Sequence, residues 1–186
     1  MVDTIFTSPS ETGIASYNYA DIASGSSNLT LYMGKIGNPE VNTMQNFKFM
    51  SGTNEVSLAL YGGGTLLLTP QTFDFLVNKQ ITLKGMCIIN IPACYNTTGP
   101  VFTAVITAEV CKWDGVTETS LGSGSSAGYL GGAAPSWFTG CCIITIGNTI
   151  IRKGEYLRLK ISGSGVGGNV TSIIMSVNPS GINANY

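Results

Sequence analysis

Short runs of apolar and β-branched residues, separated by Gly, Asn, Pro and Ser, make up most of this chain. In residues 28–36 every second residue from Leu29 to Met33 is apolar, as expected of a strand with one buried face. Residues 86–91 are apolar at nearly every position, which predicts a strand buried on both faces or central in its sheet. Pro92 is expected to end that strand because it has no backbone N–H to donate.

Turn signals divide the rest of the chain into further strands. Gly62–Gly64 separates runs at residues 56–61 and 65–69 and predicts a hairpin, because glycine permits the positive φ of a tight reversal. Asp114–Gly115 is a strong hairpin signal, since both residues tolerate the left-handed conformation of a type I′ turn. Residues 152–155, which are Arg, Lys, Gly and Glu, are expected to form another, charged turn. The remaining strands are expected at residues 101–113, 116–121, 138–146, 150–151, 156–162 and 170–177.

Signals for helices are nearly missing. The three-residue spacing of Val41, Met44 and Phe47 is the one hint of a helical turn. Roughly eight to ten strands follow one another at intervals of about a dozen residues, the density typical of two packed sheets. The sequence therefore predicts an all-β fold, a two-sheet antiparallel sandwich of jelly-roll type, as a single domain over residues 28–186.

An extended N-terminal arm, residues 1–27, is predicted to precede this domain. The arm is rich in Ser and Thr and holds a few apolar side chains, and the candidate interface residues among them are Ile5, Phe6, Tyr17 and Tyr19. Such a segment could lie across a neighbouring subunit. Alternatively it frays, or it closes one edge of its own sheet.

A second candidate for a subunit interface follows the loop that the Gly-, Ser- and Ala-rich composition of residues 122–134 predicts. In and beside this loop lie four large side chains, Tyr129, Leu130, Trp137 and Phe138. A monomer would struggle to bury all four, and aromatic residues are enriched at the centres of protein interfaces. The alternative is a loop that folds over its own sandwich.

The low charge of the chain favours burial between subunits. Charged residues make up 10% of the sequence and hydrophobic residues 44%, with a formal net charge of -1. Few solvating groups are thus available to cover an outer surface. Near-zero charge also argues against nucleic acid as a partner. No apolar run approaches the ~18 residues of a membrane helix, and the first ten residues do not resemble a secretory signal.

Candidate chemistry is sparse. The chain has no histidine, the commonest proton shuttle near neutral pH, and its five cysteines are expected to be free thiols packed as small apolar groups. The G-x-G-x-x-G pattern at residues 163–168 precedes a strand instead of a helix, so we interpret it as a hairpin loop. No cofactor and no metal ion is expected.

Carboxylates beside an aromatic residue could describe a sugar site, because glycosidases need only two carboxyl groups. Glu109 and Asp114 flank Trp113, and Glu118 lies across the predicted hairpin. The same residues also suit the polar positions that keep strand faces and turns solvated, and this second interpretation is favoured.

Three segments carry a resemblance to known proteins: FDFLVNKQITLKGMCIINIP at residues 73–92, TAVITAEVCKWDGVTETSLG at 103–122 and IIRKGEYLRLKI at 150–161. Their succession resembles the single jelly-roll virion proteins of tailed bacteriophages and related viruses, such as head decoration or cement proteins and minor capsid components. The RKGEYLRLKI element is also similar to the late hairpin of trimeric jelly rolls of the tumour-necrosis-factor and complement type.

The resemblance implies a structural protein of the virion, made in the host cytoplasm, that is not an enzyme. It would assemble symmetrically, as a homotrimer, and attach to the major capsid protein or other virion proteins. The alternative is a carbohydrate-binding β-sandwich module, for example on a fibre or receptor-binding protein, that uses aromatic residues such as Trp113, Tyr129 and Trp137. An enzyme with a two-carboxylate mechanism is the third hypothesis.

Overall fold

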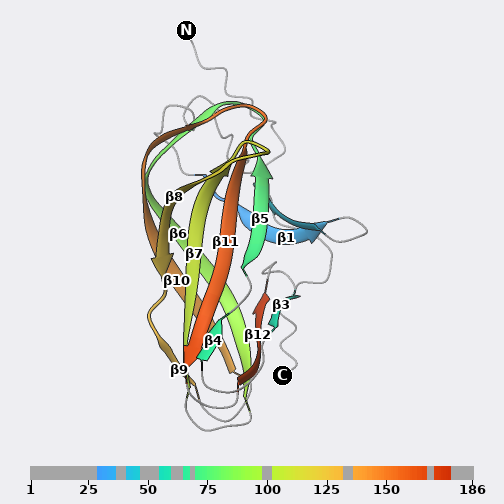
Figure 1. Ribbon diagram of the computed structural model, residues 1–186, viewed down its shortest axis with the longest axis vertical. Helices are drawn as coiled ribbons and strands as arrows, with labels where there is room; N and C mark the ends of the chain where they lie inside the picture. Colours follow the sequence, from blue (N-terminus) through green and yellow to red (C-terminus); the bar gives the residue numbers. More distant parts are fainter. Residues whose placement is uncertain are drawn as a thin grey trace, which may run out of the picture.

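The computed structural model describes residues 29–36, 41–46, 55–59, 65–67, 70–97, 102–131, 136–166 and 170–176, and these ranges contain strands and no helix (Figure 1). The strands are β1 (Tyr32–Ile36), β2 (Val41–Gln45), β3 (Glu55–Ala59), β4 (Thr65–Leu67), β5 (Gln71–Leu76), β6 (Ile81–Thr97), β7 (Phe102–Trp113), β8 (Glu118–Ser125), β9 (Tyr129–Gly131), β10 (Ser136–Ile151), β11 (Tyr156–Val166) and β12 (Val170–Ser176). The helical turn predicted from Val41 and Met44 is wrong, because both residues lie in β2.

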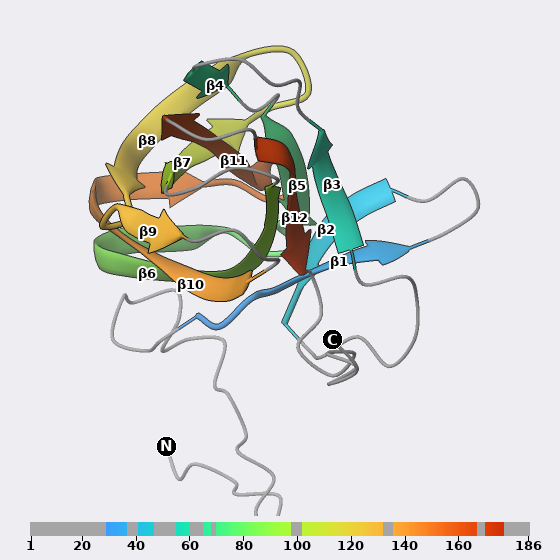
Figure 2. The same ribbon diagram turned by 90° about the horizontal axis from the view of Figure 1, so that it is seen from below.

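The strands form two sheets. Sheet A has the order β1-β2-β5-β11-β7-β8, with β4 paired to β11 and β9 to β7. Sheet B has the order β10-β6-β12-β3. Every described pairing is antiparallel except a single parallel contact between β2 and β5, at Thr43 and Asp74. Figure 2 shows β7 and β11 of sheet A above β6 and β10 of sheet B.

The strand order is that of a jelly roll. The eight strands that make up its frame are, in chain order, β3, β5, β6, β7, β8, β10, β11 and β12. Sheet B pairs β3 (the first) with β12 (the eighth), β12 with β6 (the third) and β6 with β10 (the sixth). Sheet A pairs β5 (the second) with β11 (the seventh), β11 with β7 (the fourth) and β7 with β8 (the fifth). The predicted antiparallel jelly-roll sandwich is therefore confirmed.

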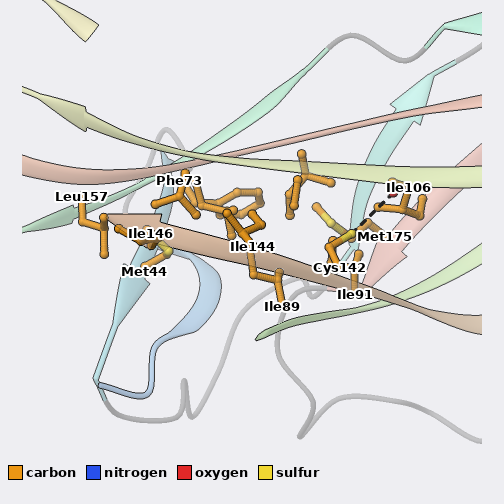
Figure 3. Close-up of a cluster of buried hydrophobic side chains, with 14 of the residues drawn as sticks. Met44, Phe73, Ile89, Ile91, Ile106, Cys142, Ile144, Ile146, Leu157 and Met175 are labelled. Carbon is orange, nitrogen blue, oxygen red and sulfur yellow. Dashed lines mark hydrogen bonds between the residues drawn. The ribbon is translucent and has the colours of Figure 1, made fainter. Parts of the chain in front are cut away.

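The core lies between the inward faces of the two sheets (Figure 3). Along β7 every second residue from Ala104 to Val110 is buried, and along β10 every second residue from Phe138 to Ile146. This period of two is the strand alternation that the sequence shows. One polar contact crosses the core, where the Sγ of Cys142 in β10 donates to the backbone oxygen of Ile106 in β7 at 3.5 Å.

Two local predictions about strand ends are wrong. The expected hairpin on either side of Gly62–Gly64 does not form, since β3 pairs with β12 in sheet B and β4 with β11 in sheet A. Glycine permits a reversal of the chain but does not decide which strand becomes the partner. Pro92 does not end β6 but lies inside it, opposite Thr139. β12 pairs with β6 only from Ala93 onward, so proline's missing N–H falls where β6 has one partner instead of two.

The segments predicted as Gly-rich loops are largely strand. β8 continues to Ser125, β9 follows, and Gly163–Val166 extends β11. The glycines of β8 serve close packing, because a Cβ at Gly124 would overlap the backbone oxygen of Ile143 in β10. A Cβ at Gly122 would lie 2.8 Å from the Cγ2 of Ile144. β8 thus crosses directly against β10 and closes this side of the sandwich.

The hairpin predicted at Asp114–Gly115 is confirmed, but its loop has four residues between the paired Trp113 and Glu118 and is not a two-residue turn, so β8 begins at Glu118 and not at Val116. Asp114 Oδ1 accepts hydrogen bonds from the backbone N–H groups of Val116 and Thr117, at 2.9 and 2.7 Å. Gly115 has a φ of 101°, which side chains rarely permit. The turn at residues 152–155 also forms, between β10 and β11.

Candidate interaction surface

The outer face of sheet A carries an ionic network that joins three strands. Arg158 of β11 lies opposite Asp74 of β5 and binds both of its carboxylate oxygens, through Nε at 2.7 Å and Nη2 at 2.8 Å. Its Nη1 donates to Glu118 of β8 at 3.1 Å. This fork geometry holds a guanidinium between two carboxylates and is the strong form of a salt bridge.

Lys160, two residues further along β11, extends the same network. Its Nζ lies 2.7 Å from Glu118 and 3.3 Å from Glu109 of β7. Hydrogen bonds from Lys160 and Arg158 lower the pKa of Glu118, and a hydrogen bond with Ser120, together with Lys160, lowers the pKa of Glu109. A catalytic acid needs a raised pKa, so the carboxylates considered for a sugar site are arranged as structural anions.

Trp113 is covered by its neighbours on this face. The guanidinium of Arg158 lies 3.9 Å from the centre of the Trp113 ring, and the ring of Tyr156 lies 5.0 Å away by centroids. Asp114, the other acid beside Trp113, accepts hydrogen bonds from the backbone of the turn between β7 and β8. The sequence suggested a sugar site with two carboxylates beside an aromatic residue. The residues named for it, Glu109, Trp113, Asp114 and Glu118, instead take part in the packing and the turn of sheet A.

Cys111 lies among these charged groups. It occupies an outward position of β7, between Glu109 and Trp113, yet only 1% of it is exposed. Burial raises the pKa of its thiol to about 11, and the negative charges of Glu109 and Glu118 act in the same direction. A thiol this hard to ionise is a poor nucleophile, which agrees with the predicted role as a packed apolar group.

The outer face of sheet B is different. Over residues 86–94 of β6 and 137–145 of β10 alternate residues point inward, and those that point outward form what we call the uncharged face. Its members on the two paired strands are Met86, Ile88, Asn90, Pro92, Cys94, Trp137, Thr139, Cys141, Ile143 and Thr145. None of these ten side chains is charged. Met86, Ile88 and Ile143 are 68%, 54% and 58% exposed.

Two alternatives were predicted for residues 86–91. The central place in the sheet is confirmed, because β6 lies between β10 and β12 in sheet B, but burial on both faces is wrong. Ile89 and Ile91 are buried in the core, whereas Met86 and Ile88 point outward. Within the described ranges, no strand or helix packs on the outer side of β6. A run that is apolar on both faces predicts a layer on each side, and the described strands supply the layer on the inner side.

The four candidate interface residues near the predicted loop do not form one group. Tyr129 and Phe138 stack on each other at 4.6 Å between centroids, and Phe138 belongs to the core. Leu130 lies opposite Thr103 in sheet A and is 70% exposed. Trp137 belongs to the uncharged face of sheet B. The candidates Ile5, Phe6, Tyr17 and Tyr19 of the arm lie outside the described residues.

Sequence reasoning missed the central members of both surfaces. The alternation in residues 156–161 could have placed Arg158 and Lys160 on one face of a strand, opposite Leu157 and Leu159. The partners of Arg158 are 84 and 40 residues away along the chain, so no local pattern identifies them.

Neither a metal cluster nor a membrane span is found where the structure describes the chain. No three Cys, Asp or Glu side chains of the described ranges come together in a way that could hold a metal ion. Within the same ranges there is no helix that a lipid bilayer could accommodate as a span.

Comparison with known proteins gives no family. No protein-family model and no curated protein matches this sequence. A crystal structure of a CocE/NonD family hydrolase from Staphylococcus aureus aligns with a TM-score of 0.47 and 10% identity, over 81% of this chain and 37% of that chain. A second crystal structure from that hydrolase family and organism gives 0.39 and 8%, over 74% and 39%. The chain spans well under half of these hydrolases, and likeness at these values carries no argument about its function.

Proposed function

We propose that this chain is a structural subunit of a virus particle, a decoration or minor capsid protein, and that it assembles with copies of itself and catalyses no reaction. The proposal extends to a homotrimer that attaches to the major capsid protein or another virion protein.

The observation that carries the proposal is the contrast between the two outer faces of the sandwich. Sheet A presents a network of Asp74, Glu109, Glu118, Arg158 and Lys160, which suits contact with water. The paired strands of sheet B present ten outward positions without a charge. A contiguous exposed apolar surface on a protein marks an interaction site, and a structural subunit has such a site wherever it meets its neighbours.

The chemistry of the chain supports a role without catalysis. Glu109 and Glu118 share Lys160, and burial keeps the Cys111 thiol protonated. An enzyme with two carboxylates needs one group of high pKa beside one of low pKa, in a site that substrate reaches. The carbohydrate-binding alternative needs an open aromatic platform. Arg158 and Tyr156 lie against Trp113, and Tyr129 stacks on Phe138, so of its three aromatic residues Trp137, 37% exposed on sheet B, is the one left to serve it.

Purified virus particles provide the test. We expect an antibody against this chain to detect it in particles that have been banded twice on a density gradient, in a fixed ratio to the major capsid protein. Absence of the chain from the banded particles would overturn the proposal.

A further inference from the structure

We propose that neighbouring copies of this chain pack their sheets B against one another, with the uncharged face of β6 and β10 at the contact and the ionic network of sheet A turned outward. This inference rests on the proposed function and names the surface through which the subunit assembles. The occupant of the uncharged face is a second copy of the chain.

The shape of sheet B favours contact through its face. β10 is an edge strand of sheet B, and the unpaired backbone groups of an edge can recruit another strand. Here β8 crosses against that edge so closely that Gly124 leaves no room for a Cβ beside the oxygen of Ile143. An extended peptide or arm therefore has no free backbone edge to pair with along this part of β10. An exposed face without charges instead suits a second sheet, which packs at about 10 Å from it.

The absence of charge favours a copy over a different protein. When a symmetric assembly brings equivalent surfaces together, every charge near the symmetry axis meets a like charge, which costs several kcal/mol. The uncharged face avoids this repulsion, because Lys84, the nearest charged outward residue of β6, lies beyond its end. Interfaces between identical subunits are also the more apolar class.

Three side chains provide the centre of the contact. Ile143 lies opposite Ile88, and Met86 is two residues along β6. Side chains directly opposite each other on one face of an antiparallel pair lie within contact distance of each other. Ile143, Ile88 and Met86 form an exposed aliphatic cluster that a facing sheet can cover, and Cys141 is the next outward residue along β10.

The test compares two substitutions of exposed aliphatic residues on opposite sheets. Ile143→Lys places an ammonium group in the proposed contact, whereas Leu130→Lys places the same group on the outer side of sheet A. Both side chains are exposed in the single chain, so at a protein concentration where the wild type is monomeric the thermal unfolding of both variants should remain close to that of the wild type. We expect Ile143→Lys to weaken self-association by about 100-fold and Leu130→Lys to leave it unchanged, as measured by sedimentation.

Cys141 provides a second readout in the native sequence. It is exposed in the isolated chain and lies in the proposed contact. We expect iodoacetamide to alkylate it slowly in the wild-type assembly and rapidly in Ile143→Lys, with peptide mass spectrometry as the measurement. Ile88→Lys, from the other strand, should behave as Ile143→Lys does and replaces it if that variant does not fold.

Each outcome separates the inference from the proposed function. An assembly that survives both Ile143→Lys and Ile88→Lys, with Cys141 still freely alkylated, overturns the inference and leaves a structural subunit that uses another surface. Dissociation by Leu130→Lys alone moves the contact to sheet A and also overturns it. A wild-type chain that stays monomeric while present in virus particles contradicts contact between copies but not the role in the virion.

Discussion

Ile143 of β10 lies directly opposite Ile88 of β6, and both side chains point away from the core with more than half of each residue exposed. The next residue along each strand, Ile144 and Ile89, points inward and is buried. At these positions both strands are thus apolar on both faces, and no described strand covers the outer side of their sheet. Because apolar surface is costly in water, the pair indicates that another molecule supplies the missing layer.

The close crossing of β8 and β10 predicts a strong effect of adding a single methyl group. In Gly124→Ala the new Cβ would overlap the backbone oxygen of Ile143, and neither backbone can move without disturbing its own sheet. We expect a loss of about 2 kcal/mol in the free energy of unfolding, measured by urea denaturation. Gly147→Ala is the control, since a Cβ at Gly147 meets nothing within 4 Å and should change stability little. Equal effects of the two substitutions would contradict the described crossing.

The network on sheet A predicts that Arg158 stabilises the fold. Arg158→Met keeps the aliphatic part of the side chain but removes the bonds to Asp74 and Glu118 and the contact with Trp113. We expect a loss of about 2 kcal/mol in the free energy of unfolding, because hydrogen bonds between charged groups are lost and Asp74 remains half-buried. Lys153→Met, in the exposed turn before β11, should change it by less than about 0.5 kcal/mol. An unchanged unfolding midpoint in Arg158→Met would exclude a stabilising role.

The same network predicts lower stability in acid. The pKa of Glu118 and that of Glu109 are lowered in the folded chain, so the unfolded chain binds more protons than the folded chain as the pH falls. Their contribution is complete above the ordinary glutamate pKa of 4.5 and is lost as the pH falls through the lower, folded values. Lys160, whose pKa is raised, contributes until the pH exceeds 10.5 and is not involved in this acid range.

The measurement for this pH dependence is the urea midpoint at neutral pH and at about pH 3. Glu118→Gln removes one of the titrating groups that favour the folded state, so the difference between the two midpoints should be smaller in this variant than in the wild type. A wild-type midpoint that rises in acid would show that these carboxylates are not held as anions.

Cys111 provides a chemical probe of the same face. Since burial and two neighbouring carboxylates raise the pKa of its thiol to about 11, it should be alkylated at mildly alkaline pH about 100-fold more slowly than in urea-unfolded protein. Iodoacetamide labelling followed by peptide mass spectrometry gives the two rates. Rapid labelling of Cys111 in the native protein would mean that the network above it is open.

The fold could be predicted from the sequence where its signals are local. Alternation put Leu29, Leu31 and Met33 on one side, and these three pack against the core, although β1 begins only at Tyr32. The Asp114–Gly115 pair placed a hairpin that the structure contains. Where the outcome depends on distant segments, the prediction failed. Gly122 and Gly124 suggested a loop by composition, but they are small because β10 crosses against them.

The candidate surfaces were harder to predict for the same reason. The run that contains Met86 and Ile88 shows that two apolar layers are needed, but it does not show whether the second comes from this chain. The grouping of Tyr129 with Trp137 followed from their proximity in sequence. In the structure Tyr129 faces the core and Trp137 the outside, because each strand alternates between two faces.

Sedimentation equilibrium of the purified wild-type chain is the most direct test of the central claim that copies of this chain cover the outer side of sheet B. The account predicts a concentration-dependent mass that rises above the 19.5 kDa of the single chain, to twice that mass if two uncharged faces meet and to three times if the contact closes the proposed trimer. A mass that stays at 19.5 kDa up to the highest soluble concentration would contradict it.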